Sequence, residues 1–323
     1  LAADNAGFAW AFYREVTEPG KNLFFSPHSL SVALAMTWAG AREDTESEMA
    51  EALRFRLGQE RLHVAFNGLD LELESRAESA GESAPLPFTL NVTNALFGQV
   101  GYQFLDAFLD TLAENYGAGM RLMDFIQATE ESRLAINTWV SKQTNERIKD
   151  LIPQGIITAA TRLVLVNAIF FTASWADPFD EGNTQDRPFK RLDSSEASVP
   201  TMRKTIDAVY ASESGFQAAE IPYDGQQLAM LVIVPDEGQF DAVESLLSAS
   251  RVSEIRAALS RHTVDLSLPK FSFRSNVPSK EPLKALGMVE AFGGNADLAG
   301  MNGTGGLFIQ DVVHQAFVAV DEK

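Results

Sequence analysis

The stretch Leu307–Lys323, with the sequence LFIQDVVHQAFVAVDEK, carries the strongest information about the fold of this chain. Its first fourteen residues include ten apolar side chains, rich in Val and Phe, and neither Gly nor Pro. Such a run is typical of a long strand that is covered on much of both faces. His314 lies at its centre, where a polar ring needs a hydrogen-bond partner.

A second run of the same kind lies upstream, at Leu163–Phe171 (LVLVNAIFF). It also contains one polar residue, Asn167, among apolar neighbours. Two buried strands with one polar residue each indicate a polar lock inside a central sheet. We therefore expect Asn167 and His314 to hydrogen bond to each other.

The composition limits the kind of protein that this chain can be. With 323 residues, 46% of them hydrophobic, and neither an internal repeat nor a low-complexity linker, the chain favours one domain over residues 1–323. Its 26 basic and 44 acidic residues give a formal charge of −18, which repels nucleic acid and anionic membranes. We expect neither of these as a partner.

Cysteine is absent, which excludes a thiol nucleophile, a disulfide framework and thiolate metal sites. The lack of disulfides fits the cytosol and does not rule out secretion. No apolar run approaches the length needed to span a membrane. The first residue is Leu1, without a basic and apolar leader, so a signal peptide was either never present or already removed.

Local patterns predict a mixture of helices and strands. We expect helices at residues 2–16, 27–38, 45–53, 102–116, 130–148, 240–258 and 280–286, and further strands at 22–25, 88–99, 121–125, 217–223, 227–234 and 263–273. Asp224-Gly225 is a strong hairpin signal. Residues 57–78 are ambiguous, residues 172–210 look polar and rich in turns, and loops are expected at 78–87 and 293–306.

The four histidines show no metal-ligand spacing, and no phosphate-binding or hydrolase motif is present, so we expect no metal and no other cofactor. Ser26 or Ser29, with His314 and Asn167, has the residue types of a nucleophile, a base and an orienting group. These residues lie at a predicted helix start and inside apolar strands, and no elbow glycines expose a serine. We expect structural hydrogen bonding here, with an unrelated hydrolase as the alternative.

Six segments in the same order resemble the serpins, a superfamily of serine-protease inhibitors. Each segment alone is a weak signal, whereas six in the right order are specific. They are Asn22–Leu30 (NLFFSPHSL), Glu146–Pro153 (ERIKDLIP), Leu163–Trp175 (LVLVNAIFFTASW), Leu268–Phe271 (LPKF), Ala296–Gly300 (ADLAG) and Val313–Glu322 (VHQAFVAVDE).

The resemblance implies an α+β fold in which helices surround three β-sheets, the large central one being sheet A. It also implies a reactive-centre loop directly after Lys323, so that the hinge, the scissile bond and the last strands are missing from this sequence. A target protease would cleave that loop and form an acyl-enzyme. The loop would then insert into sheet A between the strands at Leu163–Phe171 and Leu307–Val320, in a known example of strand addition.

The same resemblance assigns roles to particular residues. The shutter, which must part for insertion, would consist of Asn22, Ser26, Ser29, Asn167 and His314. The breach, where insertion starts, would consist of Trp175, Lys270 and Glu322, with Lys270 and Glu322 as an ion pair, and the approach to the hinge would be Val320, Asp321, Glu322 and Lys323. Gln315 replaces the Lys of many serpins and is expected to face solvent.

Function is thus predicted to be inhibition of a serine protease as a suicide substrate, with cysteine proteases as a further target class. The chain would be an inhibitor rather than an enzyme, and a monomer in its native state that can polymerise. The alternative is a non-inhibitory serpin, a carrier or chaperone on the same fold. Small residues beyond Lys323 would favour the inhibitor, and bulky residues or Pro would favour the alternative.

Overall fold

The computed structural model describes residues 1–78, 89–117 and 120–323. These residues form two compact units. Unit 1 contains Leu1–Leu71, Asn91–Phe170 and Arg274–Phe317, and unit 2 contains Glu72–Leu90, Phe171–Phe273 and Val318–Lys323. Helices and strands in both units confirm the α+β class.

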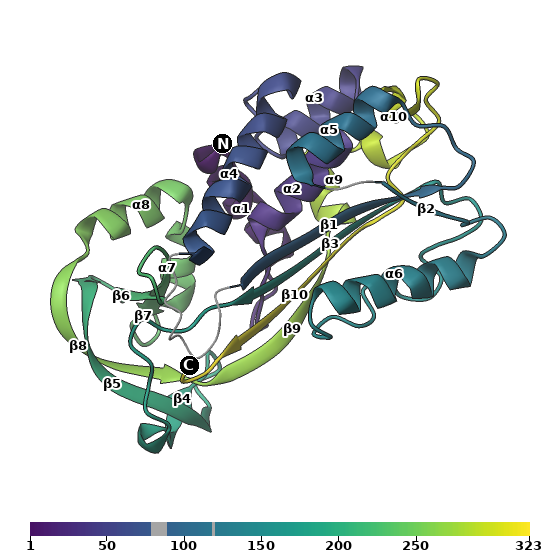
Figure 1. The fold of residues 1–323 in the computed structure, drawn as a ribbon. Coiled ribbons are helices and arrows are strands. Elements are labelled where there is room, and N and C mark those ends of the chain that lie inside the picture. Colours follow the sequence, from purple (N-terminus) through teal and green to yellow (C-terminus); the bar gives the residue numbers. More distant parts are fainter. Residues whose placement is uncertain (79–88, 118–119) are drawn as a thin grey trace. The chain divides into compact units, whose positions relative to one another are not determined.

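A five-stranded sheet is the centre of unit 1 (Figure 1). Its strands follow the order β2, β1, β3, β10 and β9, with bounds Arg121–Met123, Thr89–Gln99, Leu163–Thr172, Val312–Val320 and Phe271–Pro278. Strands β3 and β10 are parallel, and His314 lies directly opposite Asn167 in their register. We call this β3–β10 pairing the seam.

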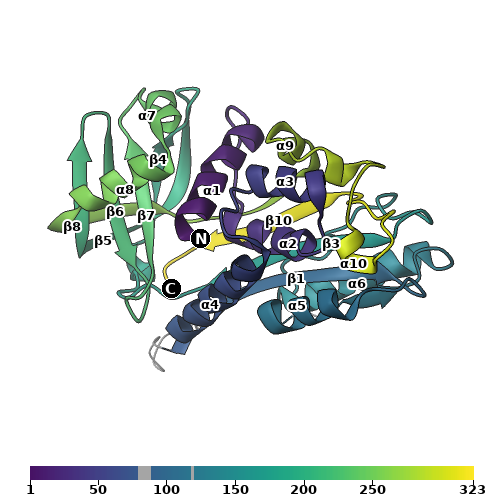
Figure 2. The same ribbon diagram turned by 90° about the horizontal axis from the view of Figure 1, so that it is seen from above.

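Helices cover both faces of this sheet in unit 1. They are α1 (Ala2–Val16), α2 (Pro27–Trp38), α3 (Glu43–Ala52), α4 (Gln59–Glu78), α5 (Asp106–Tyr116), α6 (Thr129–Gln143), α9 (Lys280–Ala285) and α10 (Ala299–Asn302), with the short 3-10 helix η2 (Glu290–Phe292). Figures 1 and 2 show α2 over one face of the sheet, and Figure 1 shows α6 on the other. None of the helices in the described residues is long and apolar enough to cross a membrane.

Alternation along β3 and β10 sends successive side chains into two different cores. Leu163, Leu165 and Val312 belong to the core on the α2 side. Val166 and Val313 instead belong to the core beneath α6. Asn167 and His314 follow the first of these patterns, so both side chains point toward α2.

Unit 2 contains a second sheet, with the order β4, β5, β6 and β7 and with β8 also paired to β5. The bounds of its elements are η1 (Glu181–Asn183), β4 (Gln185–Lys190), β5 (Glu196–Glu213), β6 (Phe216–Pro222), β7 (Ala229–Pro235), α7 (Phe240–Leu246), α8 (Ala249–Ala258) and β8 (Ser260–Pro269). Strand β5 pairs with β4 at one end, with β8 in the middle and with β6 at the other end. The described residues therefore form two sheets rather than the expected three, because this one long strand joins all of its neighbours.

Several local expectations are confirmed, and one ambiguous segment is resolved. The ambiguous residues 57–78 contain helix α4. Helix α5 ends at Gly117, whose φ of 56° is the left-handed conformation that glycine adopts readily. Asp224-Gly225 lies in the turn between the antiparallel strands β6 and β7. The predicted loop at 78–87 lies almost entirely outside the described residues.

Other local expectations are wrong. Residues 172–210 contain β4 and most of β5, whose exposed side chains carry enough charge to hide the strand alternation. Residues 22–25 form no strand, and residues 263–273 belong to two strands that meet at Pro269-Lys270. The predicted helix at 240–258 is two helices, because Ser248 caps the second one by accepting from the Arg251 N–H. The predicted loop at 293–306 contains helix α10.

Helix α2 contains one polar group that should weaken the fold. Thr37 is completely buried, and its Oγ1 has no hydrogen-bond partner among the described residues. We expect Thr37→Val, which keeps the shape and removes the hydroxyl, to raise the free energy of unfolding by about 1 kcal/mol, measured by urea denaturation.

Thr144 provides the matched control for this prediction. It is equally buried, but its Oγ1 donates to the Val140 carbonyl and accepts from the Ile148 N–H. Thr144→Val should therefore lower stability. A Thr37→Val protein that is less stable than the unmodified one would contradict the prediction.

Candidate functional site

His314 and Asn167 form the hydrogen bond that their positions in two apolar strands predict. The His314 Nδ1 and Asn167 Oδ1 atoms are 2.5 Å apart. Both side chains are almost completely buried, with exposed fractions of 0% and 1%. Two strands thus share one polar contact in an otherwise apolar layer.

Backbone groups at the start of α2 determine which atom donates and which accepts in the hydrogen bonds of this cluster. The Ser26 N–H can only donate, and it meets His314 Nε2 at 3.0 Å, so Nε2 accepts and carries no proton. His314 Nδ1 then donates to Asn167 Oδ1. The Asn167 Nδ2 group donates to the Ser29 carbonyl at 2.7 Å, which fixes the orientation of the amide. We call Ser26, Ser29, Asn167 and His314 the clasp.

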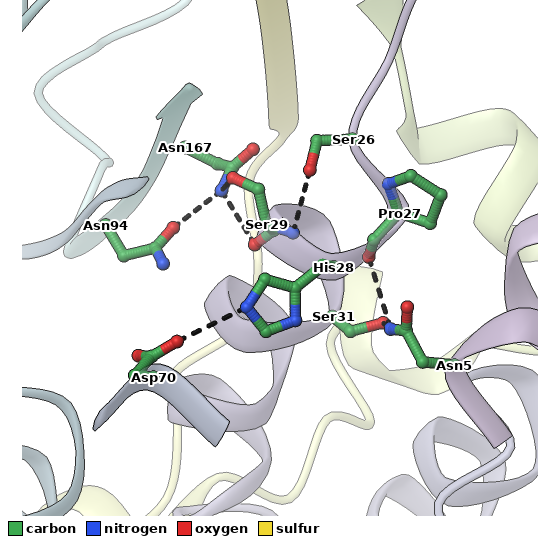
Figure 3. A network of polar contacts seen from close by, with 9 residues as sticks. All are labelled: Asn5, Ser26, Pro27, His28, Ser29, Ser31, Asp70, Asn94 and Asn167. Carbon is green, nitrogen blue, oxygen red and sulfur yellow. Dashed lines mark hydrogen bonds and ion pairs between the residues drawn. The ribbon is translucent and has the colours of Figure 1, made fainter. Parts of the chain in front are cut away.

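Local sequence explains why α2 presents these groups. Ser26 caps the helix, since its side chain accepts from the Ser29 N–H at 3.2 Å, and Pro27 occupies the first turn, where no donor is needed (Figure 3). The cap leaves the Ser26 N–H outside the helical bonding pattern and free to meet His314. The start of α2 is thereby bound to both strands of the seam.

Asn94 is a member of this network that the sequence analysis missed. Its Oδ1, on strand β1, accepts from Asn167 Nδ2 at 2.6 Å (Figure 3). On the other side of α2, Asn5 of α1 donates to Ser31 Oγ at 2.7 Å. A polar residue inside the alternating strand at 88–99 was the only signal that pointed to Asn94.

Two expected features of this region differ in the structure. Asn22 is exposed, and no hydrogen bond joins it to the clasp in the part of the chain that the structure describes. Gln315 was expected to face solvent, but it is only 9% exposed. That expectation is wrong because β10 is covered on both faces.

Burial keeps the clasp histidine neutral. Removal from water lowers the pKa of His314 to about 4. Protonation would add a proton to Nε2, which would then face the Ser26 N–H as a second donor. The Ser26 N–H would thereby lose its acceptor. The neutral ring is therefore required by the hydrogen bonds as well as by the apolar surroundings.

The serines of the clasp are not arranged as nucleophiles. Ser26 meets His314 through its backbone N–H, and its hydroxyl accepts from the Ser29 N–H. Ser29 is fully buried, and its hydroxyl accepts from Asn167 Nδ2. No hydroxyl in the clasp contacts the histidine, and the described residues contain no group of three side chains that could hold a metal ion.

A second polar cluster, in unit 2, surrounds the end of β10. Glu322 accepts from Lys270 Nζ at 2.8 and 2.6 Å and from Thr184 Oγ1 at 2.7 Å. The Glu322 side chain is 7% exposed and that of Lys270 35% exposed. Burial alone would raise the pKa of Glu322, but the hydrogen bonds from Lys270 and Thr184 outweigh it, so this pKa lies below its ordinary value.

Trp175 holds the backbone next to this ion pair. Its Nε1 donates to the Asp321 carbonyl at 2.8 Å, and its ring stacks on Tyr223 with centroids 5.1 Å apart. The Phe179 N–H donates to the Glu322 carbonyl at 2.9 Å. The structure therefore brings together the three residues expected at the breach and adds Thr184, which the sequence analysis missed.

The residues that the sequence analysis expected at the approach to the hinge contact the same cluster. Val320 is buried beside Trp175 in an apolar group of unit 2. The Lys323 N–H donates to the Asp321 carboxylate at 3.0 Å. Each of the four residues from Val320 to Lys323 therefore makes an apolar contact or a hydrogen bond in this region.

Comparison with known proteins shows what this chain resembles. The model of the family described as "Serpin (serine protease inhibitor)" matches residues 3–323. Leukocyte elastase inhibitor of Sus scrofa is 36% identical over 334 residues, covering 100% of this chain and 86% of that protein. Serpin B9 of Homo sapiens is 37% identical over 311 residues, covering 94% and 80% of the two chains. The structure of uncleaved ovalbumin has a TM-score of 0.91 at 24% identity, covering 99% and 86%, and shows a likeness of fold.

Acidification should weaken the folded chain through its two buried histidines. Burial also lowers the pKa of His63 to about 4, and the ordinary value of both rings is 6.5. Between these values the unfolded chain binds more protons than the folded one. The free energy of unfolding should therefore fall as the pH drops from about 6.5 toward 4, by on the order of 1–3 kcal/mol per histidine.

Urea unfolding at a series of pH values measures this effect. His314→Gln and His63→Gln should each remove part of the slope. An unfolding free energy that stays constant between about pH 6.5 and 4.5 would contradict the assignment of neutral buried rings.

Charge reversal tests whether Lys270 and Glu322 stabilise each other. Glu322→Lys places two like charges together in a mostly buried position, so it should lower the free energy of unfolding by about 2 kcal/mol. Adding Lys270→Glu should recover part of that loss, since the pair is restored with opposite polarity. Effects that simply add in this double-mutant cycle would show that the two side chains do not interact.

Proposed function

This chain belongs to the serpin family, and from that premise we propose that it inhibits serine proteases as a suicide substrate. The observation that carries the proposal is the seam. Strands β3 and β10 are direct parallel neighbours in a five-stranded sheet, from Val312 opposite Leu165 to Ala316 opposite Ile169. A new central strand would have to enter between them.

Strand geometry supplies a driving force for that insertion. A segment that follows β10 and folds back into the seam would run antiparallel to both neighbours. One parallel ladder would then be replaced by two antiparallel ladders, which pair slightly better per residue and satisfy more backbone groups. The chain would therefore become more stable once the seam opens and the new strand is inserted.

The clasp would supply the kinetic barrier against opening. Insertion must separate Asn167 from His314, and until new partners are made, buried donors and acceptors stay unsatisfied. A closed state held by such a barrier persists although it is not the most stable one. Cleavage by a protease, with formation of an acyl-enzyme, would release the loop at the moment when its insertion can displace and distort the protease.

Elastase-like proteases are the first targets to test, because a relative that is 36% identical carries the name leukocyte elastase inhibitor. We expect the full-length protein to form an adduct that survives denaturing electrophoresis, since the acyl-enzyme is an ester. The panel should also contain chymotrypsin-like, trypsin-like and cysteine proteases. A protease whose catalytic nucleophile is replaced by Ala is the matched control and should give no adduct.

Simple cleavage by every protease, with no band of higher mass, would overturn the proposal. That outcome would favour the carrier or chaperone function on the same fold. A heat-stability measurement on the cleaved protein separates the two cases further, because a chain that inserts its loop becomes much more stable after cleavage.

A further inference from the structure

Helix α4 begins in a buried polar cluster that is separate from the clasp and from the ion pair. His63, on the second turn of α4, is 5% exposed. The Tyr116 hydroxyl at the end of α5 lies 2.6 Å from His63 Nδ1, and Gln59 Oε1 lies 3.0 Å from His63 Nε2. Gln59 Nε2 in turn lies 2.8 Å from the Trp38 carbonyl at the end of α2. Three helices therefore meet around one histidine.

The Trp38 carbonyl determines which atom donates in each of these hydrogen bonds. A carbonyl can only accept, so Gln59 Nε2 faces it and Gln59 Oε1 faces the histidine. His63 Nε2 therefore carries a proton and donates it to Gln59, while His63 Nδ1 accepts from the Tyr116 hydroxyl. The His63 ring is thus neutral, and its proton is on the other ring nitrogen from that of His314.

A second proton on His63 would disrupt this cluster. A proton on Nδ1 would turn the Tyr116 oxygen into an acceptor, and the phenol proton would lose its present partner. Burial and, after it, the Asp70 carboxylate raise the pKa of Tyr116, so the phenol keeps its proton. The charged imidazole would also lie between the rings of Trp38 and Tyr116, whose centroids are 5.9 and 5.7 Å away. Protonation of His63 is therefore compatible only with an opened cluster.

The middle of α4 is held to α2 by a different histidine. His28 Nε2 lies 3.3 Å from Asp70 Oδ1, and Figure 3 shows the two side chains pointing toward each other. Protonation of His28 leaves a donor facing the carboxylate and adds an opposite charge, so it does not break this contact. Glu60 and Arg61, the charged residues next to His63 on α4, are exposed and give its ring no buried counter-charge. The two histidines therefore respond to acid in opposite ways.

We propose that α4 is an acid-sensitive helix, whose start is released when His63 gains a proton while His28 and Asp70 keep its middle on α2. Burial lowers the pKa of His63 from 6.5 to about 4, so an opened start would bind a proton that the closed start excludes. Release would uncover the apolar layer in which Trp38 contacts Phe55. An acidic environment would thus cause a local change in unit 1, whether or not the chain inhibits a protease.

NMR of the nitrogen-labelled imidazole rings in the full-length protein tests the geometry. At pH 7 the His63 ring should be neutral with its proton on Nε2, and the His314 ring should be neutral with its proton on Nδ1, as the hydrogen bonds of each ring require. A His63 ring that is charged at pH 7, or that carries its proton on Nδ1, would overturn the proposal.

Hydrogen exchange of the same protein at a series of pH values tests the release. The exchange rates are first corrected for the intrinsic pH dependence of amide exchange. Opening at residues 59–66 of α4 and 112–116 of α5 should become roughly twentyfold more frequent between pH 7 and pH 5, because only the opened His63 ring binds the proton. Residues 68–72, around Asp70, should respond much less.

Two variants separate the release from a general loss of stability. His63→Gln replaces the ring by an amide that takes up no proton in this pH range, so opening at the start of α4 should lose most of its dependence on pH. His28→Gln is the matched control, which should lower protection in the middle of α4 and keep the acid response at its start. Equal acceleration throughout unit 1, or an undiminished acid response in His63→Gln, would overturn the proposal. The measurements on the unmodified protein decide the question even where a variant does not fold.

Discussion

A one-directional chain of hydrogen bonds is the constraint on which the centre of this structure depends. It runs from the Ser26 N–H through His314 and Asn167 to the Ser29 carbonyl. Both ends are backbone groups of one helix terminus, one able only to donate and the other only to accept. No member can reverse, and the imidazole must stay neutral for the chain to exist, so strand register, helix position and protonation state depend on one another.

Under the proposed function, this dependence would let a closed sheet be well ordered and still able to open. Apolar packing has no direction and would tolerate a gradual separation of β3 and β10, whereas a buried polar chain is either complete or broken. In the proposed mechanism the seam would therefore have few intermediate states, which would favour a switch over a continuous deformation.

The ion pair at the end of β10 differs from the clasp, because one of its two side chains is partly exposed to solvent. Lys270 remains partly exposed, so solvent screens its charge, while Glu322 is buried and depends on Lys270 and Thr184 for its hydrogen bonds. The ion pair contributes mainly because it gives the buried Glu322 carboxylate its hydrogen-bond partners, and less through the attraction between the two charges. A pair of this kind defines the position of the strand end.

The sequence by itself determined the two long strands and their polar contact, because a lone Asn or His inside an apolar run must find a buried partner. Family resemblance was needed to bring Lys270 to Glu322, since neither position has a pattern of its own. Tertiary structure alone decided the rest. Asn94 and Thr184 have partners far away in the chain. Ser26 and Ser29 were expected in the cluster from the resemblance, but their use of a backbone N–H and a backbone carbonyl could not be predicted, because no sequence pattern distinguishes backbone groups. The burial of Gln315 and the union of the expected second and third sheets through β5 likewise depend on which elements pack together, which is set by the fold as a whole.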